Sequence, residues 1–245
     1  MFKNYIFDLY GTLIDIYTCE TAPELWEKMS FFYGYRKANY TPSELQQKYL
    51  ALCSIKKQET IAKHTDYTRV DFDLTEIFKE LYTEKGVECS DELAKITANV
   101  FRCFSTKHIG LYDGVLDLLD TLKAKEKKIY LLSNAQTDFT RPEMDMLGLT
   151  DYFDGILISS EEECSKPDLH YFQMLFDRYG LEKEESVFVG NDCVSDIKGA
   201  TDFGLKSLYI HQEISPPISG KLSATWRIMD GDFRQVKKKI VAGTY

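Results

Sequence analysis

Four groups of polar residues each follow a short apolar run, and together they carry the functional groups for nucleophilic chemistry on an anionic substrate. They are Asp8-Leu-Tyr10-Gly-Thr12, Ser133-Asn134, Lys166-Pro167 and Gly190-Asn-Asp192-Cys-Val-Ser-Asp196. A carboxylate can act as a nucleophile, hydroxyl and amide groups can hold an anion, and an ammonium can neutralise charge. Each group alone has an ordinary structural explanation, such as a turn or a helix cap, so the prediction depends on their combination.

The last group contains two acids, Asp192 and Asp196, that would share one face of a helix at a spacing of four residues. Mg²⁺ prefers a few carboxylates together with water and substrate oxygens. The sequence therefore predicts a magnesium site here. The alternative is a helix N-cap followed by an ordinary exposed acid.

The elements that must position these groups are short apolar runs separated by segments with helical patterns. The runs predict strands at residues 4–8, 128–133, 155–159, 186–190, 206–210 and 224–228. Strands that alternate with helices predict a Rossmann-like α/β fold with a parallel sheet. Helices at 113–124 and 168–179 would cover this sheet, and 233–241 would form a closing helix. Ligands gather beyond the carboxyl ends of such strands, where the four polar groups lie.

Residues 18–107 differ, because they contain amphipathic stretches and no run that resembles a strand. Helices are predicted at residues 22–33, 42–57, 72–85 and 91–104, and Pro23 and Pro42 stand where a helix tolerates proline best. We therefore expect an all-helical domain at 18–107, inserted into a core domain made of residues 1–17 and 108–245.

Composition limits the classes of partner that the chain is expected to bind. The chain has 245 residues and a formal net charge of −9, so it would repel nucleic acid and anionic lipid surfaces. Its six cysteines form no C-x-x-C pair, and neither a signal peptide nor a membrane-spanning apolar stretch is evident. We expect a cytoplasmic protein with reduced thiols and a small anionic substrate. The oligomeric state stays open.

In their order and spacing, the four groups resemble the four motifs of the haloacid dehalogenase superfamily, over nearly the whole chain. The resemblance implies that Asp8 is a nucleophile that forms a covalent aspartyl intermediate, and that Thr12 supports its turn. It also implies that Ser133 and Asn134 bind the anionic group of the substrate. Lys166 would then screen the charge between nucleophile and substrate.

The same resemblance implies a metal site and a cap. Asp192 and Asp196 correspond to the acidic pair that binds Mg²⁺ together with Asp8, and Tyr10 would contribute its backbone carbonyl. The helical insert resembles the cap that closes over the active site in one branch of the superfamily.

Tyr10 departs from the pattern of the phosphatases in this superfamily, which carry a second aspartate at that place to protonate the leaving group. A phenol, with an ordinary pKa near 10, matches this task poorly at neutral pH. The Asp-x-Tyr-Gly-Thr form instead resembles the 2-haloacid dehalogenases, in which halide leaves without a proton. Asp192, by contrast, resembles a residue of metal-binding phosphohydrolases.

Three functions follow from this mixture. Mg²⁺-dependent hydrolysis of a small phosphorylated metabolite is favoured, because an acid pair matters only where a cation is bound. The second is a metal-independent 2-haloacid dehalogenase, which would need a cationic group near the start of the insert, and Arg36 has roughly suitable spacing. The third is a non-catalytic protein that binds a phosphorylated ligand.

Overall fold

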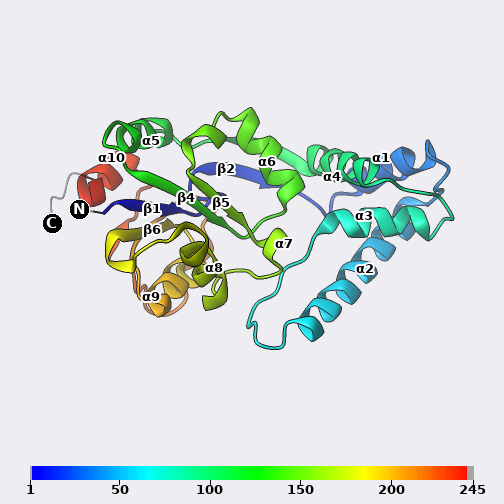
Figure 1. The fold of residues 1–245 in the computed structure, drawn as a ribbon. Helices are drawn as coiled ribbons and strands as arrows, with labels where there is room; N and C mark the ends of the chain where they lie inside the picture. Colours follow the sequence, from blue (N-terminus) through cyan, green and yellow to red (C-terminus); the bar gives the residue numbers. More distant parts are fainter. Residues whose placement is uncertain (1, 242–245) are drawn as a thin grey trace.

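A central parallel sheet organises the molecule. The computed structural model describes residues 2–241, and within them six parallel strands lie in the order β5-β4-β1-β6-β7-β8 (Figure 1). Their bounds are β1 Asn4–Phe7, β4 Lys128–Ser133, β5 Gly155–Ile158, β6 Ser186–Gly190, β7 Lys206–Ile210 and β8 Trp226–Ile228. The predicted Rossmann-like α/β core is confirmed, since each predicted strand is present and all but the last match to within one residue.

Helices cover both faces of the sheet, which is why most residues of its strands are buried and apolar. On one face lie α5 (Val115–Ala124), α6 (Thr137–Met146) and α10 (Phe233–Val236), the last continued by a π-helical turn over Lys237–Val241. On the other lie α8 (Leu169–Tyr179) and α9 (Gly199–Phe203), and the short α7 (Ser159–Glu162) follows β5. Sequence analysis does not predict α6, a largely polar helix with Pro142 inside it.

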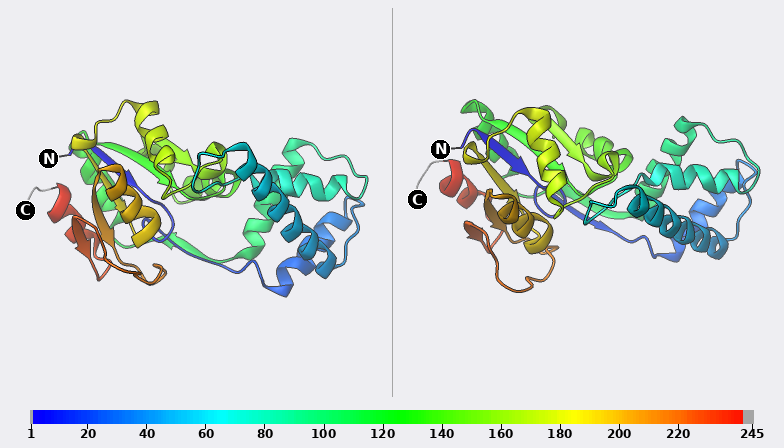
Figure 2. Two further views of the ribbon diagram at one scale, coloured as in Figure 1. Left: turned by 90° about the horizontal axis from the view of Figure 1, so that it is seen from below. Right: turned by 60° about the horizontal axis from the view of Figure 1, so that its bottom comes forward.

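Four further helices extend to one side of the sheet and form a helical part (Figure 2). They are α1 (Pro23–Gly34), α2 (Pro42–Lys63), α3 (Leu74–Thr83) and α4 (Asp91–Ser105). They share their own apolar core, rich in aromatic rings. Helix α2 begins with a Thr41 capping box and runs six residues past its predicted end at residue 57. No helix within residues 2–241 is both long and apolar enough to cross a lipid bilayer.

An antiparallel ribbon joins the helical part to the core. Strand β2 (Ile14–Thr18) leaves the core and β3 (Thr106–Leu111) returns to it, with Ile14 opposite Leu111. Sequence analysis predicts neither strand, because each mixes polar and apolar residues and both are only partly buried. The two strands cross the boundaries expected near residues 18 and 107.

A second connection is the loop between α2 and α3, which runs back from the helical part to the core beside α7 (Figure 1). Val70 forms an isolated antiparallel bridge with Cys164. The amide of Asp71 donates to the carbonyl of Glu163, and the amide of Ser165 donates to the carbonyl of Arg69. The helical part therefore contacts the core along this loop as well as through the ribbon.

Candidate active site

The polar groups singled out in the sequence meet at the carboxyl edge of the sheet. Because Phe7 lies opposite Leu131 of β4 and Val189 of β6, the loops that follow these three strands emerge side by side. They surround a pocket of about 260 Å³. Its lining includes six of the eight predicted site residues: Asp8, Tyr10, Asn134, Lys166, Asp192 and Asp196.

Asp8 lines this pocket, and Thr12 lies behind it, outside the lining. The Thr12 hydroxyl donates to Oδ2 of Asp8 at 2.9 Å, and the Asp8 amide donates to the carbonyl of Val189. Between them, Gly11 has a φ of +77°, and a Cβ atom there would lie 2.3 Å from the side chain of Asn191. Glycine is therefore required for the turn that presents the Asp8 carboxylate.

Lys166 lies between two carboxylates. Its side chain is 1% exposed, and Nζ is 2.7 Å from Oδ1 of Asp8 and 2.7 Å from Oδ1 of Asp196. Burial alone would lower the pKa of Lys166, but the Asp196 and Asp8 carboxylates outweigh burial and raise it. The ammonium is thus held charged beside the predicted nucleophile.

Asp196 binds Lys166 and two backbone amides at the same time. Its Oδ2 accepts hydrogen bonds from the amides of Asn191 and Asp192, each at 3.0 Å, while Oδ1 binds Lys166. Burial and then the nearby Asp8 carboxylate raise the pKa of Asp196, whereas Lys166 opposes the rise. Both oxygens of Asp196 are therefore occupied by protein donors.

Asp192 caps the π-helical turn Cys193–Lys198, as the N-cap alternative anticipated. Its Oδ1 accepts from the amides of Val194 and Ser195, at 2.7 and 3.0 Å. These bonds use one oxygen, which leaves Oδ2 as the oxygen of Asp192 that can bind a ligand in the pocket. Within residues 2–241, no three acidic, histidine or cysteine side chains are grouped closely enough to hold a metal by themselves.

The two residues after β4 differ in what their side chains bind. The Ser133 hydroxyl is buried and has no hydrogen-bond partner among residues 2–241. Asn134 instead holds the backbone of Lys166, donating to its carbonyl at 2.9 Å and accepting from its amide at 2.8 Å. An unpaired buried hydroxyl is costly, so Ser133 is a donor that a bound anion could satisfy.

The Tyr10 hydroxyl points to helix α6. It donates to Oε2 of Glu143, and its oxygen lies 3.2 Å from the Thr140 hydroxyl oxygen. Glu143 also accepts from Nε of Arg102 at 2.6 Å, and the Arg102 guanidinium lies 5.3 Å from the centre of the Tyr10 ring. Burial and then the Glu143 carboxylate raise the pKa of Tyr10 well above its ordinary value.

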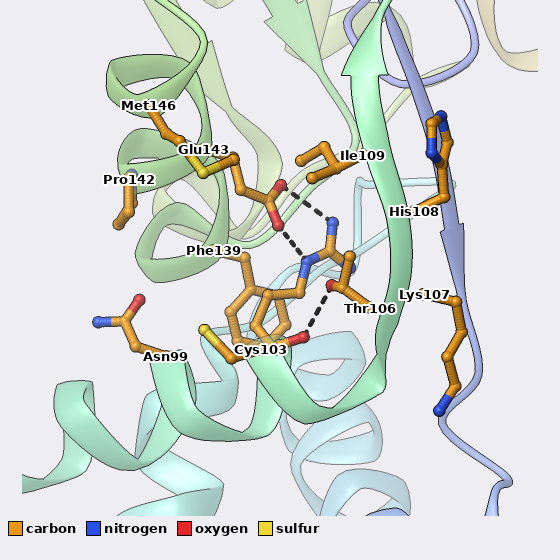
Figure 3. A pocket seen from close by; sticks show the side chains of 11 residues that line it. Asn99, Cys103, Thr106, Lys107, His108, Ile109, Phe139, Pro142, Glu143 and Met146 are labelled. Atoms are coloured by element: carbon orange, nitrogen blue, oxygen red, sulfur yellow. Dashed lines mark hydrogen bonds and ion pairs between the residues drawn. The ribbon is translucent and has the colours of Figure 1, made fainter.

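Glu143 and Arg102 are the residues of this region that sequence analysis missed. Figure 3 shows the side chain of Glu143 projecting from α6, the helix that also carries Phe139, into a second pocket of about 330 Å³ between α4, β3 and α6. Neither residue belongs to a recognisable motif, and the pair is 41 positions apart. Arg36, the arginine considered from spacing, stacks on Phe32 and donates to its carbonyl, and it does not line the pocket around Asp8.

A parallel sheet covered by helices, with an acid and lysine cluster in a pocket at its carboxyl edge, defines an α/β protein with a site where such folds bind their ligands. The chain belongs to the haloacid dehalogenase-like hydrolases, because the model of that family matches residues 2–204. It is 24% identical to the pyrimidine 5'-nucleotidase PynA of Streptococcus pneumoniae over 213 residues, which are 85% of this chain and 83% of PynA.

Solved structures show the same fold. A 2-haloacid dehalogenase from Pseudomonas syringae superposes with a TM-score of 0.69, at 20% identity and with 99% of both chains covered. The HAD-hydrolase YfnB of Bacillus subtilis, in a magnesium-bound form, gives a TM-score of 0.55 at 19% identity, with 97% of both chains covered. The chain therefore shares its fold with a dehalogenase and with a magnesium-bound HAD-hydrolase.

Proposed function

We propose that the protein is a Mg²⁺-assisted phosphatase of small phosphorylated metabolites, with Asp8 as its nucleophile. The observation that carries the proposal is one pocket that joins Asp8, Lys166 and Asp192. A carboxylate, a buried ammonium and a second carboxylate with an available oxygen suit a phosphoryl group and a divalent cation. PynA, a nucleotidase by name, supports the same chemistry.

In this mechanism the protein holds the phosphoryl group in line with Asp8. A carboxylate oxygen of Asp8 attacks phosphorus, and Lys166 neutralises the charge that nucleophile and substrate bring together. The bond between phosphorus and the leaving oxygen breaks, and the leaving group departs as an anion that takes its proton from solvent water. The Ser133 hydroxyl donates to a phosphoryl oxygen and so gains the partner that it lacks. Water then attacks phosphorus of the aspartyl phosphate and releases phosphate, which restores the Asp8 carboxylate.

The donors present fit Mg²⁺, which binds through one or two carboxylates and completes its shell with water and substrate oxygens. Asp8 and Asp192 would supply the carboxylates, and Tyr10 its backbone carbonyl. The cation would neutralise phosphoryl oxygens. Asp196 would act indirectly, because its oxygens already bind Lys166 and two amides.

We further propose that residues 18–107 are the cap domain of the enzyme. Helices α1–α4 have a core of their own, and the β2–β3 ribbon links them to the loop that carries Asp8. Cap residues that line the substrate site would then select among metabolites. The core residues 1–17 and 108–245 would carry the chemistry.

Phosphate release from sugar phosphates and nucleotides tests the proposal. We expect turnover with Mg²⁺, its loss on chelation, and a fall of about 1,000-fold or more for Asp8→Asn. Asp151→Asn, on an exposed aspartate of the core, is the matched control and should behave as wild type. Full activity of Asp8→Asn would refute the assignment of the nucleophile.

Dehalogenation is the second candidate, because the Tyr10 hydroxyl is bound to Glu143 and Thr140 and no acid takes its place. It predicts chloride release from 2-chloropropionate in the presence of a chelator. Absence of chloride release excludes it. A protein that only binds its ligand would show a raised melting temperature with phosphorylated compounds and no turnover of any substrate.

A further inference from the structure

The loop between α2 and α3 pairs with the segment that precedes Lys166. We call residues 68–71 the docking segment. Val70 lies opposite Cys164, and the hydrogen bonds on either side of this pair join Arg69 to Ser165 and Asp71 to Glu163. A part of the chain from the helical part is thereby hydrogen-bonded to the residue next to Lys166.

The side chain of Asp168, two residues after Lys166, adds hydrogen bonds to this contact. Asp168, 2% exposed, accepts from the amide and the hydroxyl of Thr68 and from the amide of Arg69. Its other oxygen accepts from the amide of His170 at 2.9 Å and so caps α8. These bonds lower the pKa of Asp168 against the opposing effect of burial, so its carboxylate stays charged at the junction.

The docking segment also reaches the loop that carries Asn134. Asp71 accepts from the buried Ser159 hydroxyl at 2.5 Å, and Ser159 in turn accepts from the amide of Ala135. Gln136 donates to the carbonyl of Phe72 at 2.9 Å. Residues beside both Asn134 and Lys166 are therefore bound to this loop of the helical part.

We propose that the docking segment is a positioning element for Lys166 and stays bound to the core throughout turnover. Asn134 holds the Lys166 backbone directly, and the docking segment fixes the residues on each side of it. The role rests on the proposed phosphatase function. Motion that admits substrate then occurs elsewhere in the helical part, not by release of this segment.

A disulfide across the bridge tests whether the segment stays docked. Val70 and Cys164 form a non-hydrogen-bonded antiparallel pair, in which Cα atoms are about 4.5 Å apart, a separation that a disulfide spans. All six native cysteines are unpaired, so Val70→Cys can be oxidised against Cys164. Val70→Ser is the matched control that cannot crosslink.

We expect oxidised Val70→Cys, with the crosslink verified by mass spectrometry, to hydrolyse its substrate within about twofold of the reduced form. A loss of tenfold or more that dithiothreitol reverses, and that Val70→Ser does not show, would overturn the proposal. Such a result would mean that the segment must leave the core during turnover.

Substitution of Thr68 tests the positioning role. Thr68→Val removes the hydroxyl bond to Asp168, and we expect kcat to fall about tenfold with little change in KM, because a displaced Lys166 affects the reaction more than binding. Thr68→Ser keeps the hydroxyl and should restore kcat. Thr65→Val, at an exposed position of the same loop, is the control. Unchanged kcat in Thr68→Val, or a change in KM alone, would contradict the proposal.

Failure of the phosphatase function would be recognised separately, as absence of phosphate release by wild type. The docked state would then be measured by hydrogen exchange at the amides of Asp71 and Ser165, which bond across the junction. Slow exchange at both is the expected result. Exchange as fast as in an open loop would overturn the docking itself.

Discussion

At the scale of single residues, Tyr10 limits the leaving groups that the proposed phosphatase could release. Its hydroxyl donates to Glu143, and loss of its proton would place a phenolate beside a carboxylate. Burial and then Asp8 raise the pKa of Asp196, but both of its oxygens accept hydrogen bonds from protein donors, which leaves no oxygen to present a proton to a substrate. Lys166, whose pKa its two carboxylate neighbours raise against the effect of burial, is a weak acid for an alkoxide at neutral pH.

This arrangement predicts a strong dependence on the leaving group. Acetyl phosphate and nitrophenyl phosphate, whose leaving groups depart as stable anions, should show kcat/KM about 100-fold or more above glycerol 3-phosphate. Tyr10→Asp should narrow that difference by accelerating the alkyl phosphate. Steady-state phosphate release on the three compounds measures both effects.

Tyr10→Phe separates the hydroxyl from the ring. It should keep the preference for good leaving groups, because the hydroxyl takes no part in proton transfer. An alkyl phosphate hydrolysed as fast as nitrophenyl phosphate by wild type would show that a proton donor exists.

Lys166 contributes to stability as well as to the proposed reaction. Lys166→Met would leave the Asp8 and Asp196 carboxylates buried without their cation, and we expect a loss of about 3–5 kcal/mol in the free energy of unfolding. Urea unfolding followed by circular dichroism measures it. Lys198→Met, which removes an exposed ion pair with Asp202, should cost less than about 1 kcal/mol. Equal losses in the two variants would contradict the structural role of Lys166.

At the scale of elements, the sequence predicted the strands and the helices with regular apolar spacing. Helix α5, for example, buries Val115, Leu118, Leu119 and Leu122, the positions that its pattern selects. Sequence analysis did not predict helix α6, because Pro142 and several polar residues interrupt the apolar spacing that is typical of a helix. Sequence analysis did not predict the ribbon, because strand β3 is partly exposed and lacks a clear alternation of polar and apolar residues.

The unpredicted helix α6 carries Glu143, whose ion pair with Arg102 joins the end of α4 to α6. Arg102 binds Glu143 through two nitrogens, at 2.6 and 3.1 Å, and both side chains are largely buried. Arg102→Lys keeps the charge but cannot form two parallel bonds. We expect a loss of about 2 kcal/mol in the free energy of unfolding, measured in urea.

Arg141→Lys is the matched control, because Arg141 pairs with Glu161 at the surface. It should change the free energy of unfolding by less than about 1 kcal/mol. If Arg102→Lys lowered the free energy of unfolding as little as Arg141→Lys, the contact between α4 and α6 would depend on apolar packing around Phe139 and not on the ion pair.

At the scale of the whole molecule, the helical part and the sheet core are joined by polar contacts and by Phe139 of α6, which packs into the aromatic core of the helical part. The aromatic core of the helical part and the cores on the two sheet faces are distinct clusters. Apolar spacing in the sequence is enough to predict the helical part and the sheet core separately. It cannot predict how they are joined, because Thr68 and Asp168, or Arg102 and Glu143, are common polar residues far apart in the chain.

The net charge of −9 and the acids gathered in the pocket predict that Mg²⁺ stabilises the folded protein. At ten times its dissociation constant, a ligand that binds only the folded state adds about 1.4 kcal/mol. For a chain of this length that corresponds to a rise of roughly 4 °C in melting temperature. Differential scanning fluorimetry with and without MgCl₂ measures the shift.

Mg²⁺ would also raise the melting temperature by screening the acidic surface in general. The experiment must therefore distinguish binding in the pocket from this screening. Asp192→Asn removes one proposed ligand and should abolish the shift, whereas Asp202→Asn removes an equal charge from an exposed position and should keep it. NaCl at matched ionic strength should give a smaller shift than MgCl₂ in wild type. A rise that survives in Asp192→Asn would place the cation away from this pocket and remove the support for Mg²⁺-assisted hydrolysis.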